Sequence, residues 1–368
     1  MKYASLRAQA FFTSLFLALL IGFLFSSTTR LEAVSASPHA FIEIQPDGSE
    51  IHLHIEGDEF FHRLRDTKGY TVLQDRGWFV FAERGKDGRL VPSGLRVGQS
   101  DPAKAGFSKN ILPDAAIQNA RRKVMAHPQR VAGAAGAGDG QAEGVAAAVP
   151  ATMKNLVVLL RFSDHASRAV PPTTNIEVLM NAVGGDPSLA PTGSVRDCFL
   201  ENSYGQFTLD STVAYWITLP NTEAYYANGD SGLTSRTHEA LRYALDTLDA
   251  DPNFQFSDFD QDSDGRIDAI TFLHSGYAAE FGGTSGDGAS YLNRMWSHKW
   301  AIGGAWFSSD GVRVYEYHIS PGIWSTSGTN IGRIGVIAHE TGHFLGLPDL
   351  YDGSGGSGIG SWGLMANS

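Results

Sequence analysis

The chain has 368 residues, of which 42% are hydrophobic, and this is enough to bury one or two cores of ordinary size. The formal net charge of -11 argues against a nucleic-acid or anionic-membrane partner, which would need a basic face. The single cysteine, Cys198, excludes an intramolecular disulfide and is expected to be a buried small apolar residue.

The amino-terminal segment has the pattern of a secretory signal peptide. Lys2 and Arg7 precede an almost wholly apolar run over residues 11–25, and the small residues at 34–36 favour cleavage after Ala36. This run is shorter than the roughly 20 residues that a spanning helix needs, and no later stretch is long enough to cross a bilayer. Residues 1–36 are therefore predicted to be a signal peptide and the mature chain to be secreted; an uncleaved anchor is the alternative.

A β-rich segment and a linker are predicted next. Residues 40–100 alternate apolar and polar positions between turn dipeptides such as Asp47-Gly48, a pattern typical of an antiparallel β-meander. A basic helical stretch at 115–125 follows, and residues 131–150 are then nearly all Ala and Gly, without periodicity. The predicted organisation is a β-rich amino-terminal segment at 37–125, a linker at 126–150 and a catalytic domain at 151–368.

The second half mixes predicted strands and helices, which indicates an α+β fold. A capping box formed by Ser194 and Asp197 is expected to open a helix that runs through Glu201, and a second helix is expected at 234–248. Strands are predicted at residues 155–162, 207–209, 213–219, 269–274 and 312–319. The strand at 312–319 alternates, so it is interpreted as an edge strand along which an extended peptide pairs.

An acidic loop has the spacing of a calcium site. Asp260, Asp262, Asp264, Gly265 and Asp268 form D-x-D-x-D-G-x-x-D, the first nine positions of a calcium loop. Position twelve is Thr271 where an EF-hand has a bidentate Glu, and no helix signal precedes the loop, so an EF-hand is not predicted. The prediction is a calcium-stabilised turn that braces the domain in place of a disulfide; a solvated acidic loop is the alternative.

Residues 339–349 read H-E-x-x-H-x-x-G-x-x-D and contain the groups that a zinc-dependent hydrolase needs. His339 and His343 are four apart, so on a helix both imidazoles project from one face and reach one metal ion. Glu340 cannot share that direction, which places its carboxylate beside the metal as a general base for a zinc-activated water. The motif therefore predicts a zinc site with Glu340 as its catalytic residue.

The third zinc ligand is expected after the helix ends. Gly346 allows the left-handed conformation that ends a helix, and Pro348 prevents the helix from resuming. Asp349 then returns toward the metal as the predicted ligand and leaves the fourth position open, with Asp352 as the alternative. A distant Glu280 is a further alternative, in a gluzincin-type arrangement.

A methionine turn is predicted shortly after the motif. Residues 361–365, Ser-Trp-Gly-Leu-Met, follow it by about twenty residues, the arrangement in which metzincins carry a methionine beneath the zinc. The glycine-rich run at 353–360 allows the chain to loop back, and a turn then places Met365 under the histidines.

These segments together resemble the secreted metalloproteases of the immune inhibitor A type, a metzincin-like family. The resemblance rests on H-E-T-G-H-F-L-G-L-P-D-L-Y-D and S-W-G-L-M-A-N-S, and upstream on segments at 201–207, 216–220, 256–268, 274–277 and 296–299. It reaches the amino-terminal segment at 45–70. It implies zinc on His339 and His343, catalysis by Glu340 and a protein or peptide substrate.

The predicted function is a secreted zinc metalloendopeptidase, with a non-catalytic secreted binding protein as the alternative. The retention of Glu340 favours the enzyme, because metal binding alone does not need it. The β-rich segment is interpreted as a prosegment that keeps the cleft closed until the chain is cut at residues 121–123 or in the linker; a permanent binding or folding module is the alternative. Since the chain stops at Ser368, it is interpreted as a possible fragment.

Other titratable residues of the catalytic half carry weaker signals. His274, His298 and His318 are candidates for a role at the transition state or as the third ligand, but none has ligand spacing to another. Tyr277, Tyr315 and Tyr317 are candidate donors to an oxyanion. A structural role is the favoured interpretation for all six.

Overall fold

The computed structural model describes residues 32–33, 36–37, 39–58, 61–115, 151–283, 288–324, 330–350 and 359–366. Most of the predicted signal peptide, nearly all of the basic helix at 115–125 and the whole linker at 126–150 lie outside the described residues. In the part of the chain that is described, no helix has the length and apolar character that crossing a bilayer requires.

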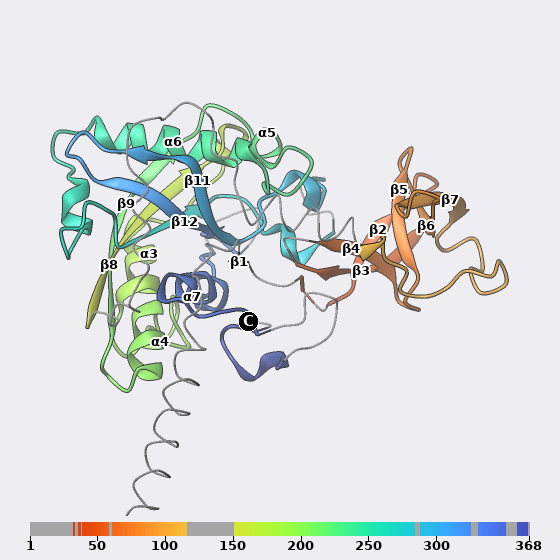
Figure 1. Cartoon of the computed structure of the whole chain (residues 1–368), viewed down its shortest axis with the longest axis horizontal. Helices are drawn as coiled ribbons and strands as arrows, with labels where there is room; N and C mark the ends of the chain where they lie inside the picture. Colours follow the sequence, from red (N-terminus) through yellow and green to blue (C-terminus); the bar gives the residue numbers. More distant parts are fainter. Residues whose placement is uncertain are drawn as a thin grey trace, which may run out of the picture.

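The amino-terminal part is a six-stranded antiparallel meander, as the turn dipeptides predicted (Figure 1). Its strands pair in chain order, and alternate residues of β3, such as Leu53 and Ile55, are buried in its core. The strands are β2 (Phe41–Ile44), β3 (Glu50–Gly57), β4 (His62–Asp66), β5 (Thr71–Asp75), β6 (Trp78–Arg84) and β7 (Leu90–Arg96).

The carboxy-terminal part is built on a second sheet with the strand order β1-β11-β12-β10-β8-β9. Four strands, β12, β10, β8 and β9, are parallel; β11 is antiparallel to β12, and β1 is antiparallel to β11. The bounds are β1 (Glu32–Ala33), β8 (Thr152–Arg161), β9 (Thr208–Thr218), β10 (Ala269–His274), β11 (His298–Phe307) and β12 (Arg313–Pro321). The predicted mixture of helices and strands is confirmed.

Two strand predictions are wrong in detail. The strand at 312–319 is β12, which lies between β11 and β10 and is not an edge strand. Alternation reports which faces of a strand are buried but not its neighbours in the sheet, so it could not separate an inner strand from an outer one. The strands predicted at 207–209 and 213–219 are one strand, β9. In its middle, the side chain of Asn181 accepts from the backbone N–H of Ser211 and donates to its carbonyl.

Helices cover both faces of this sheet. The helices α5 (Glu223–Ala227) and α6 (Ser235–Asp249) lie on one side, and α3 (Thr173–Asn181), α4 (Val195–Asn202) and α7 (Ile334–Gly342) lie on the other (Figure 1). Leu241, Leu245 and Leu248 of α6 belong to one buried cluster, whereas Ile337 and Ala338 of α7 belong to another. Short 3-10 helices occur at Ser163–His165, Phe256–Phe259, Ala279–Phe281, Tyr291–Asn293, His343–Leu345 and Gly360–Trp362.

The predicted helix starts are confirmed. Ser194 and Asp197 form the reciprocal capping box of α4, and Thr234 caps α6. Cys198, on α4, is half-buried, not fully buried as predicted, because its helix borders an open surface groove. Burial still raises the pKa of its thiol, which disfavours the reactive thiolate.

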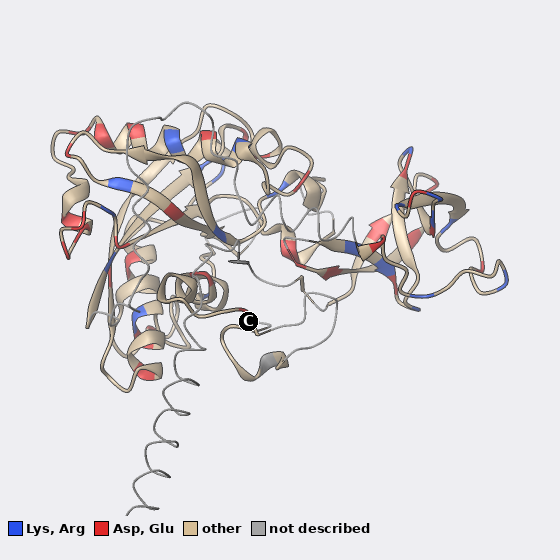
Figure 2. Cartoon of the chain, viewed as in Figure 1, with Lys and Arg blue, Asp and Glu red and all other residues tan. Residues whose placement is uncertain are grey.

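The amino-terminal sheet contacts the carboxy-terminal part beside β10 and β11. The imidazole of His62 stacks on Trp296, with ring centroids 4.8 Å apart. The ring of Phe41 lies against Gly282 and Gly283, and the backbone N–H of Ser37 donates to the carbonyl of Glu280 at 2.8 Å. Lys and Arg residues are interspersed with Asp and Glu in both parts of the chain (Figure 2).

Candidate metal centre

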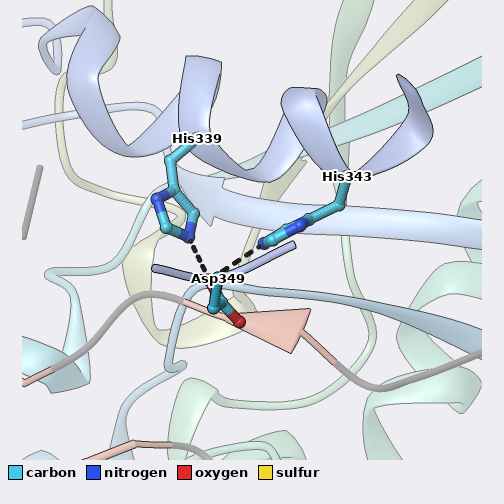
Figure 3. A group of neighbouring side chains, drawn as sticks. All are labelled: His339, His343 and Asp349. Carbon is cyan, nitrogen blue, oxygen red and sulfur yellow. Dashed lines mark ion pairs between the residues drawn. The ribbon is translucent and has the colours of Figure 1, made fainter. Parts of the chain in front are cut away.

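Helix α7 carries the two predicted histidine ligands on one face. His339 and His343 are buried, and their rings lie edge to face with centroids 4.9 Å apart. The helix tightens into a 3-10 turn at His343–Leu345 and ends at Gly346, whose φ of +75° is the left-handed conformation predicted for it. The chain then turns back, and Asp349 comes to lie beside both rings (Figure 3).

The hydrogen bonds of the two rings fix which nitrogen faces Asp349. Nδ1 of His339 lies 2.8 Å from the carbonyl oxygen of Leu364, and Nδ1 of His343 lies 2.7 Å from that of Leu347. A carbonyl only accepts, so each Nδ1 carries the proton and donates it. Both Nε2 atoms are therefore presented to Asp349, in the tautomer that a metal-binding histidine needs.

The spacing of the three ligand atoms fits zinc. Oδ1 of Asp349 lies 3.1 Å from Nε2 of His339 and 3.5 Å from Nε2 of His343. Tetrahedral ligands about 2.0–2.1 Å from one ion are about 3.3 Å from each other. Burial opposes ionisation of Asp349, but the hydrogen bonds and positive charge of the two histidines outweigh it and lower the pKa of the carboxyl. The site therefore holds an anionic oxygen beside two Nε2 atoms, each of which offers a lone pair to a metal ion when its imidazole is neutral.

Glu340 and Met365 complete the centre. Glu340 is fully buried on α7 and follows His339 directly, so its side chain leaves the helix in another direction than the two imidazoles. Met365 is buried, and a Cβ added at Gly342 would lie only 2.8 Å from its Sδ. Met365 thus packs against the turn of α7 between the two histidines, and a side chain at 342 would displace it.

Residues 186–368 match the family model described as immune inhibitor A peptidase M6, catalytic domain. This part of the chain is similar to the catalytic domain of the immune inhibitor A peptidases. Immune inhibitor A of Bacillus thuringiensis subsp. alesti is 32% identical over 50% of this chain and 30% of its own length. The pre-pro-metalloprotease PrtV of Vibrio cholerae serotype O1 (strain M66-2) is 27% identical over 47% of this chain and 21% of its own length. The matched parts are therefore less than a third of these curated relatives.

The alternative ligands of the family motif are placed as follows. Asp352 lies outside the described residues. Glu280 is buried elsewhere, where both of its carboxylate oxygens accept hydrogen bonds from Ser297 at 2.6 and 3.1 Å. Among the described residues it does not belong to a group that could hold a metal, whereas His339, His343 and Asp349 do. The geometry thus favours Asp349 over Glu280 as the third ligand.

The remaining candidate histidines and one tyrosine lie inside the core. His274, His298 and His318 are fully buried, and burial lowers their pKa values to about 3, 4 and 3. Nδ1 of His298 donates to the carbonyl of Trp296, so its Nε2 accepts from the hydroxyl of Tyr317 at 3.0 Å. That hydroxyl is engaged in the core and is not an oxyanion donor. The favoured structural interpretation agrees with these contacts.

Burial of Glu280 predicts a pH effect on stability. Burial raises the pKa of Glu280 from 4.5 to about 7. Between these pH values the folded protein retains a proton that the unfolded chain has released, so stability falls as pH rises, by up to about 3 kcal/mol. The lowered histidine pKa values act oppositely, because there the unfolded chain binds the extra protons, and stability falls as pH drops below 6.5.

The difference between the parent and Glu280→Gln isolates the effect of this carboxyl. Urea unfolding is measured for both proteins at pH 5 and at pH 8. Glu280→Gln is expected to gain stability relative to the parent at the higher pH, because it keeps a neutral side chain beside Ser297. If the difference in stability between the two proteins is the same at pH 5 and at pH 8, the pKa of Glu280 is not raised.

The acidic loop brings together three of its four predicted calcium ligands. Carboxylate oxygens of Asp260, Asp262 and Asp268 all lie within 4.8 Å of one another. Asp264 is not in this group; its carboxylate accepts the backbone N–H of Arg266 and lies 3.9 Å from the guanidinium of that residue. Burial, and to a lesser extent the charges of Asp262 and Asp260, raise the pKa of Asp268, although two backbone hydrogen bonds oppose this.

Sequence reasoning missed several groups that shape the centre. The carbonyls of Leu347 and Leu364 fix the imidazoles, but they are backbone groups and leave no residue-type signal. The contact of His318 with Thr341 of α7, at 3.2 Å, was also missed. A histidine at 318 and a threonine inside H-E-T-G-H are visible in the sequence, yet nothing in their spacing predicts that they meet.

Proposed function

We propose that this chain is a secreted zinc-dependent endopeptidase that hydrolyses peptide bonds in proteins. The observation that carries the proposal is the convergence of His339, His343 and Asp349, with both Nε2 atoms preset toward one carboxylate oxygen. Glu340 stands beside them on the same helix. The relatives, named as an immune inhibitor A and a metalloprotease, support a metal-dependent peptidase.

His339, His343 and Asp349 would hold the zinc through two nitrogens and one oxygen, which leaves a position for substrate. Bound there, zinc supplies Lewis-acid polarisation of the peptide carbonyl and a lowered pKa for water. Glu340 accepts the proton of the attacking water and passes it to the nitrogen of the departing amine.

The substrate is proposed to bind as an extended peptide along β11, not along β12. The outer edge of β11 already pairs with an antiparallel strand, β1, with Glu32 opposite Lys299 and Ala33 opposite His298. Backbone groups at this edge therefore accept a neighbouring chain by main-chain hydrogen bonding. Cleavage after Ala36 would remove β1 and leave this edge open.

Secretion and latency are part of the same proposal. Residues 1–36 are proposed as the signal peptide, 37–125 as a prosegment and 126–150 as the linker that is cut. The amino-terminal segment contacts the catalytic part at Trp296, Gly282 and Glu280, which supports a segment docked against it. One relative is named a pre-pro-metalloprotease.

Metal removal tests the proposal directly. Casein hydrolysis is measured with the secreted protein after the linker has been nicked, with its zinc content determined in parallel. Dialysis against a strong zinc chelator is expected to abolish hydrolysis, because the three side chains cannot activate water without the metal ion. Added zinc is expected to restore hydrolysis. A protein that binds zinc but cleaves nothing, even when nicked, supports the alternative of a secreted binding protein.

A structural calcium ion is proposed at Asp260, Asp262 and Asp268. Three carboxylates that meet at one point repel each other, and a hard divalent cation would relieve this repulsion. The loop joins the 3-10 helix at Phe256–Phe259 to β10, and Asp268 also accepts the backbone N–H of Lys154 in β8. Calcium would therefore brace the start of the central strands.

Calcium removal is expected to lower the melting temperature without changing the zinc content. At a calcium concentration 100 times Kd, the ligand stabilises the fold by about 2.7 kcal/mol, which corresponds to roughly 5–10 °C. Asp262→Asn should abolish this calcium-dependent shift, because it removes one of the three carboxylates of the cluster. Since Asp262 is exposed, the replacement should not disturb the core. Asp258→Asn, an exposed neighbour outside the cluster, is the control. If calcium shifts the melting temperature equally in the parent, Asp262→Asn and Asp258→Asn, the acidic loop is a solvated loop and not the calcium site.

A further inference from the structure

A row of buried polar side chains crosses the face of the sheet that α7 covers. It runs from Ser211 on β9 through Asn155 on β8 and Thr271 on β10 to His318 on β12, and each of these residues is less than 7% exposed. The registers place Ser211 opposite Asn155 and Thr271 opposite His318. The row ends at Thr341, a buried residue of α7. A polar row in an apolar core costs stability unless each group is paired.

The donors and acceptors of this row have one consistent direction. Thr271 donates its hydroxyl proton to Oδ1 of Asn155, and Thr341 donates its own to the carbonyl of Ile337. Each hydroxyl oxygen can then only accept from Nε2 of His318, at 2.7 Å from Thr271 and 3.2 Å from Thr341. Nε2 of His318 therefore carries the proton and bonds both hydroxyls, which ties β10 to α7.

Thr341 is placed to control the orientation of the metal ligands. It lies two residues after His339 and two before His343, so it projects from the helix about 200° away from each. The imidazoles face Asp349 while Thr341 faces the sheet. A rotation of α7 by about 20° would move an atom 5 Å from its axis by about 2 Å, whereas a metal–ligand distance tolerates about 0.2 Å.

We propose that His318 is a positioning residue that sets the rotation of α7 about its axis through Thr341, and so aims His339 and His343 at the metal position. Apolar packing of Ile337 and Ala338 holds α7 against the sheet, but the hydrophobic effect is non-directional and leaves the helix some freedom to rotate. The directional bond from His318 removes that freedom. The inference rests on the proposed zinc site, and it concerns metal affinity and geometry before it concerns hydrolysis.

The test compares Thr341→Val, which removes the hydroxyl at nearly constant shape, with Thr341→Ser, which keeps it. Ser320→Ala is the matched control, because Ser320 is a buried residue of β12 whose hydroxyl has no hydrogen-bond partner among the described residues. The readouts are the zinc Kd from chelator competition, the visible spectrum of the cobalt-substituted protein and the stability to urea. Thr341→Val is expected to raise the zinc Kd roughly 10- to 100-fold and to change the cobalt spectrum.

Thr341→Ser and Ser320→Ala are expected to keep the parental Kd within about threefold and the parental spectrum. If Thr341→Val does not fold, His318→Gln, which retains an N–H donor, is compared with His318→Leu by the same readouts, and only the leucine variant should change them. A parental zinc Kd and cobalt spectrum in folded Thr341→Val overturn the positioning role, whatever its stability. A parent protein that binds no zinc overturns the proposed function itself.

Discussion

Replacing Glu340 by alanine is expected to lower kcat for casein hydrolysis by roughly two to four orders of magnitude while zinc stays bound. A positioned general base contributes a factor of this size, and Glu340 is the one carboxylate of α7, which ends directly before His343. The metal is expected to remain because its proposed ligands are His339, His343 and Asp349. The measurement is kcat and KM together with the zinc content of the same preparation.

The matched variants for this prediction are Glu340→Gln and Glu177→Gln. Glu340→Gln keeps the shape of the buried side chain but cannot accept the proton, so its kcat should fall as in the alanine variant. Glu177 is exposed on α3 and does not belong to the group that could hold the metal, so its replacement should leave kcat unchanged. Activity retained in both Glu340 variants would remove the general base from the proposal, and a parallel loss of zinc would make Glu340 a structural residue.

The placement of His339 and His343 was predictable because their geometry is local. Two histidines at a spacing of four residues lie on one helical face whatever the rest of the fold does. The end of the helix at Gly346 was equally local, since a left-handed conformation there favours glycine. The approach of Asp349 needed only the turn that Gly346 and Pro348 impose, although the sequence left Asp352 and Glu280 as alternatives.

The sheet was harder to predict because strand order is not local. The strand at 269–274 was correctly placed, since a short apolar run suffices to identify it. The position of β11, between β12 and the edge strand β1, depends on which strands it pairs with, and residues 298–307 carry Gly303 and Gly304 and no clean alternation. The edge prediction therefore went to the better alternating segment, β12, which is an inner strand.

The hydrogen bonds that orient the centre were not predictable for a related reason. Leu364 lies 25 residues after His339, and His318 lies 23 residues before Thr341, so both contacts depend on tertiary folding. A lone histidine on a strand is most often a core residue, and His318 is one. What the sequence does not show is that this core residue bonds the helix that carries the metal ligands.

Replacing Asp349 by alanine is expected to weaken zinc binding by more than the roughly 10- to 100-fold typical of outer-shell changes, because a direct ligand is lost. Activity should fall with it. Among the described residues, Asp349 is the carboxylate that forms a group with both histidines in which a metal ion could be held. The ligand atoms of the three residues all lie within 4.8 Å of one another. The measurement is the zinc Kd by chelator competition, with stability to urea recorded on the metal-free protein.

The controls for this prediction are variants of the two alternative ligands. Asp352→Ala and Glu280→Gln remove the two other carboxylates that the motif left open, and both should keep the parental zinc Kd. Glu280 is already committed to Ser297, so a change there should act on stability near neutral pH and not on zinc. If Asp352→Ala loses zinc and Asp349→Ala does not, the third ligand is Asp352. In that case the 3.1 and 3.5 Å contacts of Asp349 are ion pairs with the two histidines and not part of the ligand set.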